Sequence, residues 1–213
     1  MGYTLLHNGS VIDGNGGMPI ENGAVLVRDN QIVAVGSKSA LRLPDDEIVM
    51  VDCGGGTILP GMIDTHVHVL FDGINLLEQM TKPYSLTYFE AARNLERTLQ
   101  AGITSVRDAG GADLGIKTAV SQGLIDGPRM QISITVRSIT GGHADGRMPS
   151  GIKMDFFSET PGRPDGIADG VEEVRKKVRE ILRAGADIIK VCSTGGVLSP
   201  TDQPEIPQNT QEE

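Results

Sequence analysis

Short hydrophobic runs alternate with turn-forming residues over the first 57 positions of the chain. Two such runs flank Asp29-Asn30, and two turn-forming residues between β-branched runs predict a β-hairpin. Asn8-Gly9 lies between two further runs in the same way and predicts a second hairpin. Residues 48–52 predict another strand. The pattern therefore predicts a small antiparallel sheet.

After the glycine run at 54–56, hydrophobic residues recur at spacings of three or four. Residues 86–101 and 171–182 each show one apolar helical face. The first helix is expected to begin at a capping box, Thr87 followed by Glu90, and to stop at Gly102. Between and after the helices, buried strands are expected over 103–106, 130–134 and 187–191.

Residues 101–107 and 184–190 repeat one order of features: a helix end, a glycine turn, a buried strand and, soon after, a Gly-Gly pair. Such repeated β/α units predict an α/β fold with a parallel sheet or barrel. An eight-unit barrel takes roughly 31 residues per unit, so residues 58–213 are expected to hold about its first four units. Residues 1–57 are expected to form a separate β domain. The polar residues 204–213 show no pattern, and we expect the chain to be a truncated form of a longer protein.

Composition and charge argue against nucleic-acid-binding and membrane proteins. The formal net charge is −9 with dispersed acidic residues, tryptophan is absent and aromatic residues are 3%, so no nucleic-acid partner is expected. No apolar run reaches the length of a membrane span, and no membrane partner is expected. Two distant cysteines and a start without signal-peptide character favour a reducing, cytoplasmic location.

The residues with the clearest chemistry are His66 and His68. Side chains two apart in a strand point to the same face, so both imidazoles can bind one divalent metal. Asp64 lies on that face and could supply an oxygen. The alternative is a pair of solvated histidines on an exposed strand.

The segment Pro60-Gly61-Met62-Ile63-Asp64-Thr65-His66-Val67-His68 resembles the signature of the metal-dependent amidohydrolase superfamily. The resemblance covers essentially the whole chain. It implies a small β-sandwich-type domain, to which residues 1–57 contribute, and a TIM-type (β/α)₈ barrel, of which residues 58–213 are the first half. It also implies two divalent metal ions, zinc being expected.

A second matching segment contains Lys190 at the end of the expected fourth barrel strand. In many binuclear members of the resembling family this lysine is carboxylated by CO₂ and bridges two metals, which implies the same role for Lys190. A lysine among Ile188, Ile189 and Val191 is poorly solvated, which favours the neutral amine that forms a carbamate. The alternative is a lysine that pairs with a carboxylate at the strand end.

The segment 141–145 resembles one in the prolidase-type and dipeptidase-like branch, which implies that His143 binds substrate, facing its carboxylate, and holds no metal. A surface turn is the alternative for His143. The long Gly- and Pro-rich segment 145–168 is expected to form a mobile loop over the site. Arg107 and Asp108 could support the site, but we expect a structural ion pair between them.

The resemblance implies a hydrolase of amide-type C–N bonds whose small-molecule substrates are dipeptides or N-acyl amino acids. The general acid/base aspartate and further metal histidines are expected beyond residue 213. The isolated chain is therefore expected to be inactive, with unmodified Lys190, weak metal binding and self-association, whereas the full-length enzyme is expected to be a homo-oligomer. Two alternatives stay open: a mononuclear deaminase-like amidohydrolase, and a non-catalytic scaffold that keeps the fold.

Overall fold

The computed structural model describes residues 2–73, 75–154, 157, 160–197, 199 and 202–213. The chain divides into two compact units, Met1–Gly61 and Met62–Glu213.

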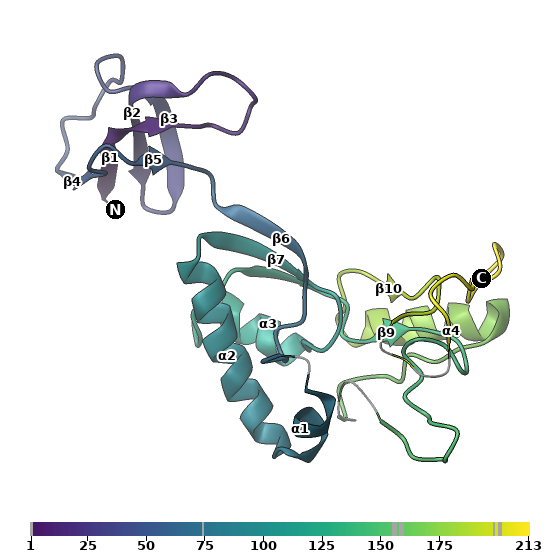
Figure 1. The fold of residues 1–213 in the computed structure, drawn as a ribbon. Coiled ribbons are helices and arrows are strands. Elements are labelled where there is room, and N and C mark those ends of the chain that lie inside the picture. Colours follow the sequence, from purple (N-terminus) through teal and green to yellow (C-terminus); the bar gives the residue numbers. More distant parts are fainter. Residues whose placement is uncertain (1, 74, 155–156, 158–159, 198, 200–201) are drawn as a thin grey trace. The chain divides into compact units, whose positions relative to one another are not determined.

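A five-stranded mixed sheet forms the first unit (Figure 1). Strands β1 and β2 are antiparallel, as are β2 and β3, whereas β4 and β5 run parallel to β1. The purely antiparallel sheet predicted for this unit is therefore wrong. The strands are β1 (Tyr3–Val11), β2 (Ile20–Arg28), β3 (Gln31–Ser37), β4 (Ile48–Asp52) and β5 (Thr57–Ile58).

The two hairpin predictions have opposite outcomes. Asp29-Asn30 forms the tight β2–β3 turn: Asp29 has φ 54°, and Arg28 pairs with Gln31. Asn8, by contrast, lies inside the continuous strand β1. Its φ is 60° and the β1–β2 register shifts there, so this site is a bulge.

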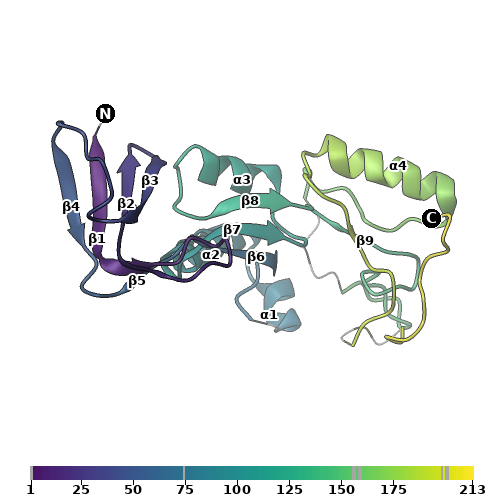
Figure 2. The same cartoon turned by 90° about the horizontal axis from the view of Figure 1, so that it is seen from above.

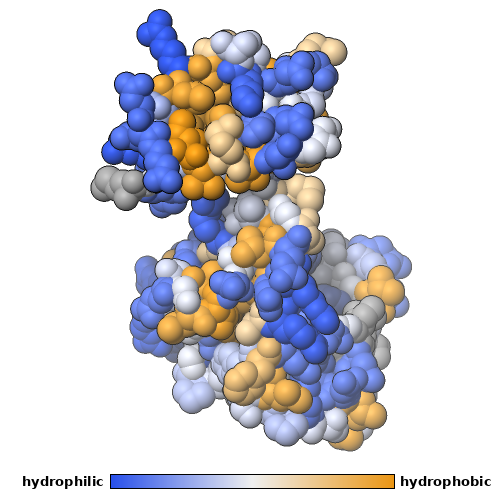
Figure 3. All heavy atoms as spheres, turned by 90° about the vertical axis from the view of Figure 1, so that its left-hand side faces the viewer, coloured by the Kyte–Doolittle hydropathy of each residue, from blue (hydrophilic) through white to orange (hydrophobic). Residues whose placement is uncertain are grey.

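The core of the first unit is small. Leu5, Ala24 and Leu26 are buried together. Other apolar side chains of the unit stay exposed, including Ile32 and Val49, and Figure 3 shows hydrophobic side chains gathered on one face of this unit. One layer of sheet leaves an apolar face that has no second layer among the described residues.

The second unit is built around a three-stranded parallel sheet in the order β6-β7-β8 (Figure 2). Helix α2 connects β6 to β7 and helix α3 connects β7 to β8, which is the β/α alternation predicted from the repeat. The elements are β6 (Met62–Val67), α1 (Leu76–Thr81), α2 (Tyr84–Gln100), β7 (Ile103–Asp108), α3 (Leu114–Ser121) and β8 (Arg129–Ile132).

Helix α2 packs its apolar face on this sheet through Ala91 and Leu95, which join the cluster formed by strand residues such as Val106 and Ile132. The capping-box prediction at its start is wrong. The helix begins at Tyr84, and its N-cap is Pro83, whose φ is −56° and ψ 130° and which makes no side-chain cap hydrogen bond. Thr87 is therefore buried inside the helix.

The last part of the unit holds β9 (Val136–Arg137), α4 (Gly170–Arg183) and β10 (Lys190–Val191). β9 and β10 form their own parallel pair. The predicted strand 187–191 is thus shorter, since the amides of Asp187 and Ile188 both donate to the carbonyl of Ile132. The mixed α/β architecture is as predicted, but the strands of the described residues form three separate sheets and no closed barrel.

Within the described residues, no helix is both long and apolar enough to cross a membrane.

Candidate metal and substrate site

His66 and His68 lie at the carboxyl end of β6. Their ring centroids are 5.3 Å apart, with an interplanar angle of 65°. His68 Nδ1 lies 2.9 Å from the carbonyl oxygen of Gly110. A carbonyl only accepts, so Nδ1 carries the proton and Nε2 of the neutral ring has a lone pair for a metal.

Lys190 acts electrostatically on His66. Burial first, and then the positive charges of Lys190 and His68, lower the pKa of His66 below its ordinary value, against the opposing charge of Asp64. The neutral imidazole, which is the form that binds metal, is therefore favoured at neutral pH. Within the described part of the chain, no carboxylate forms an ion pair with Lys190.

The donor set here fits only part of a metal site. Among the described residues, no cluster of three or more His, Cys, Asp or Glu side chains could hold a metal ion. Two imidazoles, one with its tautomer set by a backbone carbonyl, suit a divalent metal. Asp64, the oxygen donor considered above, accepts from the backbone N–H of His66 at 3.0 Å. Lys190, whose charge also acts on His66, could become a ligand only after its amine is converted to a carbamate.

Asp108, at the end of β7, does not form the ion pair with Arg107 that the sequence led us to expect. Its side chain is fully buried and accepts hydrogen bonds from the backbone N–H groups of Val69, Gly110 and Ala112. Burial raises the pKa of Asp108, while these three donors and His68 oppose that change. Arg107 is exposed, and no ion pair joins it to Asp108 in the part of the chain that the structure describes, so the predicted ion pair is wrong.

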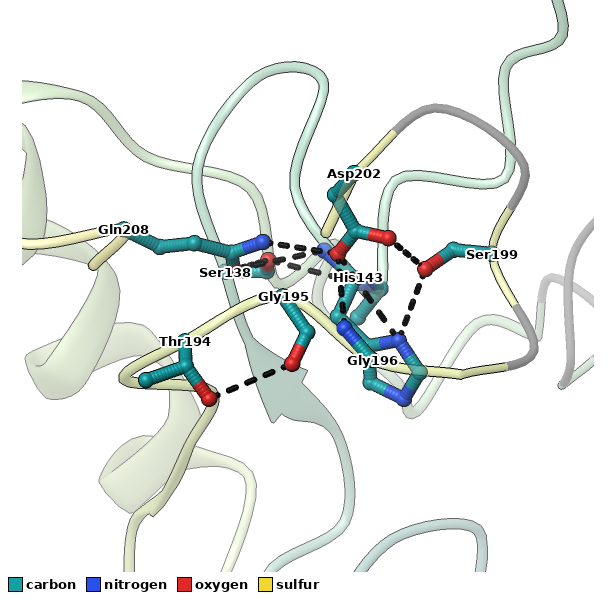
Figure 4. A network of polar contacts seen from close by, with 9 residues as sticks. Ser138, His143, Thr194, Gly195, Gly196, Ser199, Asp202 and Gln208 are labelled. Atoms are coloured by element: carbon teal, nitrogen blue, oxygen red, sulfur yellow. Dashed lines mark hydrogen bonds and ion pairs between the residues drawn. The ribbon is translucent and has the colours of Figure 1, made fainter. Parts of the chain in front are cut away.

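His143 belongs to a polar network that joins the segments after β9 and β10 (Figure 4). Its Nδ1 lies 2.9 Å from the Ser199 hydroxyl and 3.9 Å from the Asp202 carboxylate. Gln208 accepts from the backbone N–H of His143 and donates to Asp202 at 2.8 Å. His143 thus lies in a turn and is held there by specific partners, and its role in substrate binding stays a prediction.

Sequence reasoning missed Gln208, because residues 204–213 showed no hydrophobic pattern. Gln208 is buried, its backbone N–H donates to Ser193 at 2.9 Å, and its side chain accepts from Ser138 at 3.2 Å. The prediction of a structureless tail is wrong here. No local signal in the sequence marks this glutamine, since all these partners lie in other segments.

An aromatic wall borders His68. Phe71 and Phe157 stack with centroids 5.0 Å apart, and their rings lie 5.6 and 6.0 Å from the imidazole of His68. Apolar rings on one side of a ligand keep water away and strengthen its polar contacts on the other side. Part of the predicted loop 145–168, at 155–156 and 158–159, lies outside the described residues, so its role as a mobile cover stays a prediction.

Comparison with known proteins identifies the family to which the chain is similar. Residues 57–213 match the Amidohydrolase family. The ochratoxinase of Aspergillus niger is 33% identical over 222 residues, which cover 99% of this chain and 46% of the ochratoxinase.

Two solved structures are also similar over 99% of the chain. A prolidase complexed with N-methylphosphonate-L-proline is 37% identical with a TM-score of 0.84, and the match covers 51% of its chain. A Xaa-Pro dipeptidase with bound methionine in the active site is 30% identical with a TM-score of 0.82, covering 52% of its chain. The chain thus spans about half the length of these relatives.

Proposed function

The chain belongs to the amidohydrolase family, and from this premise we propose that it forms part of a metal-dependent hydrolase of amide-type C–N bonds in dipeptides or N-acyl amino acids. The observation that carries the proposal is the pairing of His66 with His68 at the end of β6, with the tautomer of His68 set by the carbonyl of Gly110. The similar structures with a proline-containing ligand and with methionine support an amino-acid-type substrate.

In this proposal His66 and His68 hold a divalent metal, for which zinc is the candidate, and Lys190 as a carbamate supplies an anionic ligand for a second metal. Bound metal would polarise the scissile carbonyl and lower the pKa of a bound water. The chain's own residues orient the reactants. Gly110 sets the His68 ring, the aromatic wall of Phe71 and Phe157 excludes water, and the network around His143 holds that side chain for contact with the substrate carboxylate.

The first test is a zinc titration of the chain and of its variants His66→Ala and His68→Ala, followed with a competing chromophoric chelator. Each variant should lose at least about tenfold in affinity at the tightest site, because a ligand is removed. His7→Ala is the matched control, since His7 lies in the first unit beside Lys38. Equal zinc affinity in all four proteins would contradict the metal assignment.

The second test separates the binuclear from the mononuclear deaminase-like alternative. Bicarbonate labelled with ¹³C should give a carbamate signal that is absent in Lys190→Met if Lys190 becomes carboxylated. A whole protein that hydrolyses its substrate at full rate without bicarbonate, and without that signal, would favour the mononuclear alternative.

A further inference from the structure

The orientation of the His68 ring depends on the contacts that hold the backbone after β7 in place. Its ring is held by the carbonyl of Gly110, at 2.9 Å from Nδ1. Gly110 has φ 141°, and a Cβ on it would lie 2.7 Å from Val136 Cγ2. Glycine adopts this conformation readily and has the most freely varying backbone of all residues, so other contacts must hold the segment in place.

Asp108 supplies that restraint. One carboxylate oxygen accepts from Gly110 at 3.0 Å and from Ala112 at 3.2 Å, which folds the chain after β7 into its turn. The other oxygen accepts from the backbone N–H of Val69 at 2.9 Å, directly after His68. One buried carboxylate therefore joins the residue following the histidine to the residue that orients the histidine ring.

The main chain of Asp108 extends this link to both neighbouring strands. Its carbonyl accepts from Ser133, after β8, at 3.1 Å, and it pairs in register with Val67 of β6 and Ile132 of β8. The carboxylate is fully buried and has three N–H donors around it. Hydrogen bonds to a charged acceptor are the stronger ones, and removing one leaves a buried N–H unsatisfied.

We propose that Asp108 is a positioning residue for the metal ligand His68: its carboxylate fixes the backbone on both sides of the His68–Gly110 hydrogen bond and so sets which imidazole nitrogen faces the metal. The proposal rests on the proposed function, in which His68 binds metal. It adds a residue outside the ligand set whose effect reaches the metal through backbone geometry.

The test compares Asp108→Asn with Asp187→Asn. An amide has one acceptor oxygen and an NH₂ group with two donors. In Asp108→Asn the oxygen can still accept from the N–H groups of Gly110 and Ala112, whereas the NH₂ group then faces the N–H of Val69, which loses its acceptor. Asp187 is the matched control, because it also accepts a strand N–H, from Ile132 at 2.9 Å. It pairs with Lys117 and, in the part of the chain that the structure describes, forms no hydrogen bond or ion pair with residues 66–69.

Two properties of the 213-residue chain are measured. Zinc affinity is determined by competition with a chelator, and the tautomer of His68 in metal-free protein is determined by ¹⁵N NMR, with the His68 signals assigned by comparison with His68→Gln. Asp108→Asn should weaken zinc binding about 10- to 100-fold and mix the tautomers of His68. Asp187→Asn should change neither. The wild-type chain should show the proton of His68 on Nδ1 and slow exchange of the Val69 amide.

Each outcome decides the proposal. If both variants change zinc affinity by the same factor, or neither does, Asp108 has no specific effect on His68 and the proposal is overturned. If the wild-type chain binds no zinc, the proposed function fails, while the tautomer still decides whether Asp108 sets the ring. If Asp108→Asn does not fold, the wild-type tautomer and amide exchange decide: a proton on Nε2 or fast exchange at Val69 overturns the proposal.

Discussion

At the scale of single residues, glycines permit the close contacts around the candidate site. A Cβ on Gly196 would lie 2.0 Å from the ring of His143, so the backbone of Gly196 lies directly against that ring. The backbone N–H of Gly196 also donates to Asp202 at 3.1 Å. The glycine at 196 is therefore explained by packing, because it lets the loop after β10 lie against His143.

Gly196→Ala should displace His143, because a methyl group cannot occupy the space of the imidazole. We expect a loss of about 1–3 kcal/mol in the free energy of unfolding, as for other overpacked sites, together with a changed NMR environment of His143. Gly162→Ala is the control, since no atom of the described residues lies within 4 Å of its Cβ position. Equal stability of the two variants, with the His143 signal unmoved, would contradict this contact.

At the scale of elements, Asp169 joins helix α4 to the segment after β9. It occupies the N-cap position of α4, but its side chain makes no cap hydrogen bond. The carboxylate instead accepts from the hydroxyl of Thr140 at 2.6 Å and from its backbone N–H at 3.0 Å. These two hydrogen bonds lower the pKa of Asp169. The aspartate thus binds a neighbouring loop, and the first backbone N–H of the helix, that of Gly170, donates to the side chain of Glu213 at 2.6 Å instead.

Thr140→Ala should lower the thermal midpoint at pH 7 by about 2 °C, in the range of exposed polar pairs. The folded pKa of Asp169 is depressed, so its stabilisation is present above the unfolded pKa of about 3.9 and is lost as pH falls through the lower folded value. The difference between wild type and variant should therefore shrink below about pH 4. Thr140→Ser, which keeps the hydroxyl, is the control in the calorimetry. A difference that stays constant down to pH 2.5 would contradict the role of Asp169.

Local patterns predicted the elements whose formation depends on nearby residues. The Asp29-Asn30 hairpin and the β/α order of the second unit belong to this group, and so does the glycine stop of α2, where Gly102 has φ 86°. The Asn8 bulge was not predictable, because it forms where a third strand, β5, pairs beside it. Burial of Asp108 was missed for a similar reason: its donors include Val69, 39 residues away.

At the scale of the whole molecule, the parallel sheet of the second unit has β6 as an edge strand in the described structure. This strand carries Met62 and Ile63, which are 55% and 69% exposed. Exposed apolar side chains on a strand edge favour pairing with another chain. The expected self-association of the isolated chain therefore has a specific candidate surface.

Ile63→Lys should reduce this association, because a charged side chain on an edge strand opposes pairing. Light scattering after size-exclusion chromatography should show the wild-type chain shifting to larger species as its concentration rises, and the variant staying closer to 22.6 kDa. Leu124→Lys is the control, since Leu124 is 73% exposed but lies outside any strand. If both lysine variants associate like wild type, the edge of β6 is not the contact.

Gln208 also has a consequence for the time course of folding. It contacts Ser138 and the amide of His143, 70 and 65 residues earlier in the chain. During synthesis at about 5–20 residues per second, β6, β7 and their helices can assemble seconds before residue 208 leaves the ribosome. Until then Ser138 and His143 have only water in place of the glutamine, and closing so long a loop is slow. The polar network around His143 is therefore completed only after the histidine pair on β6 is already in place.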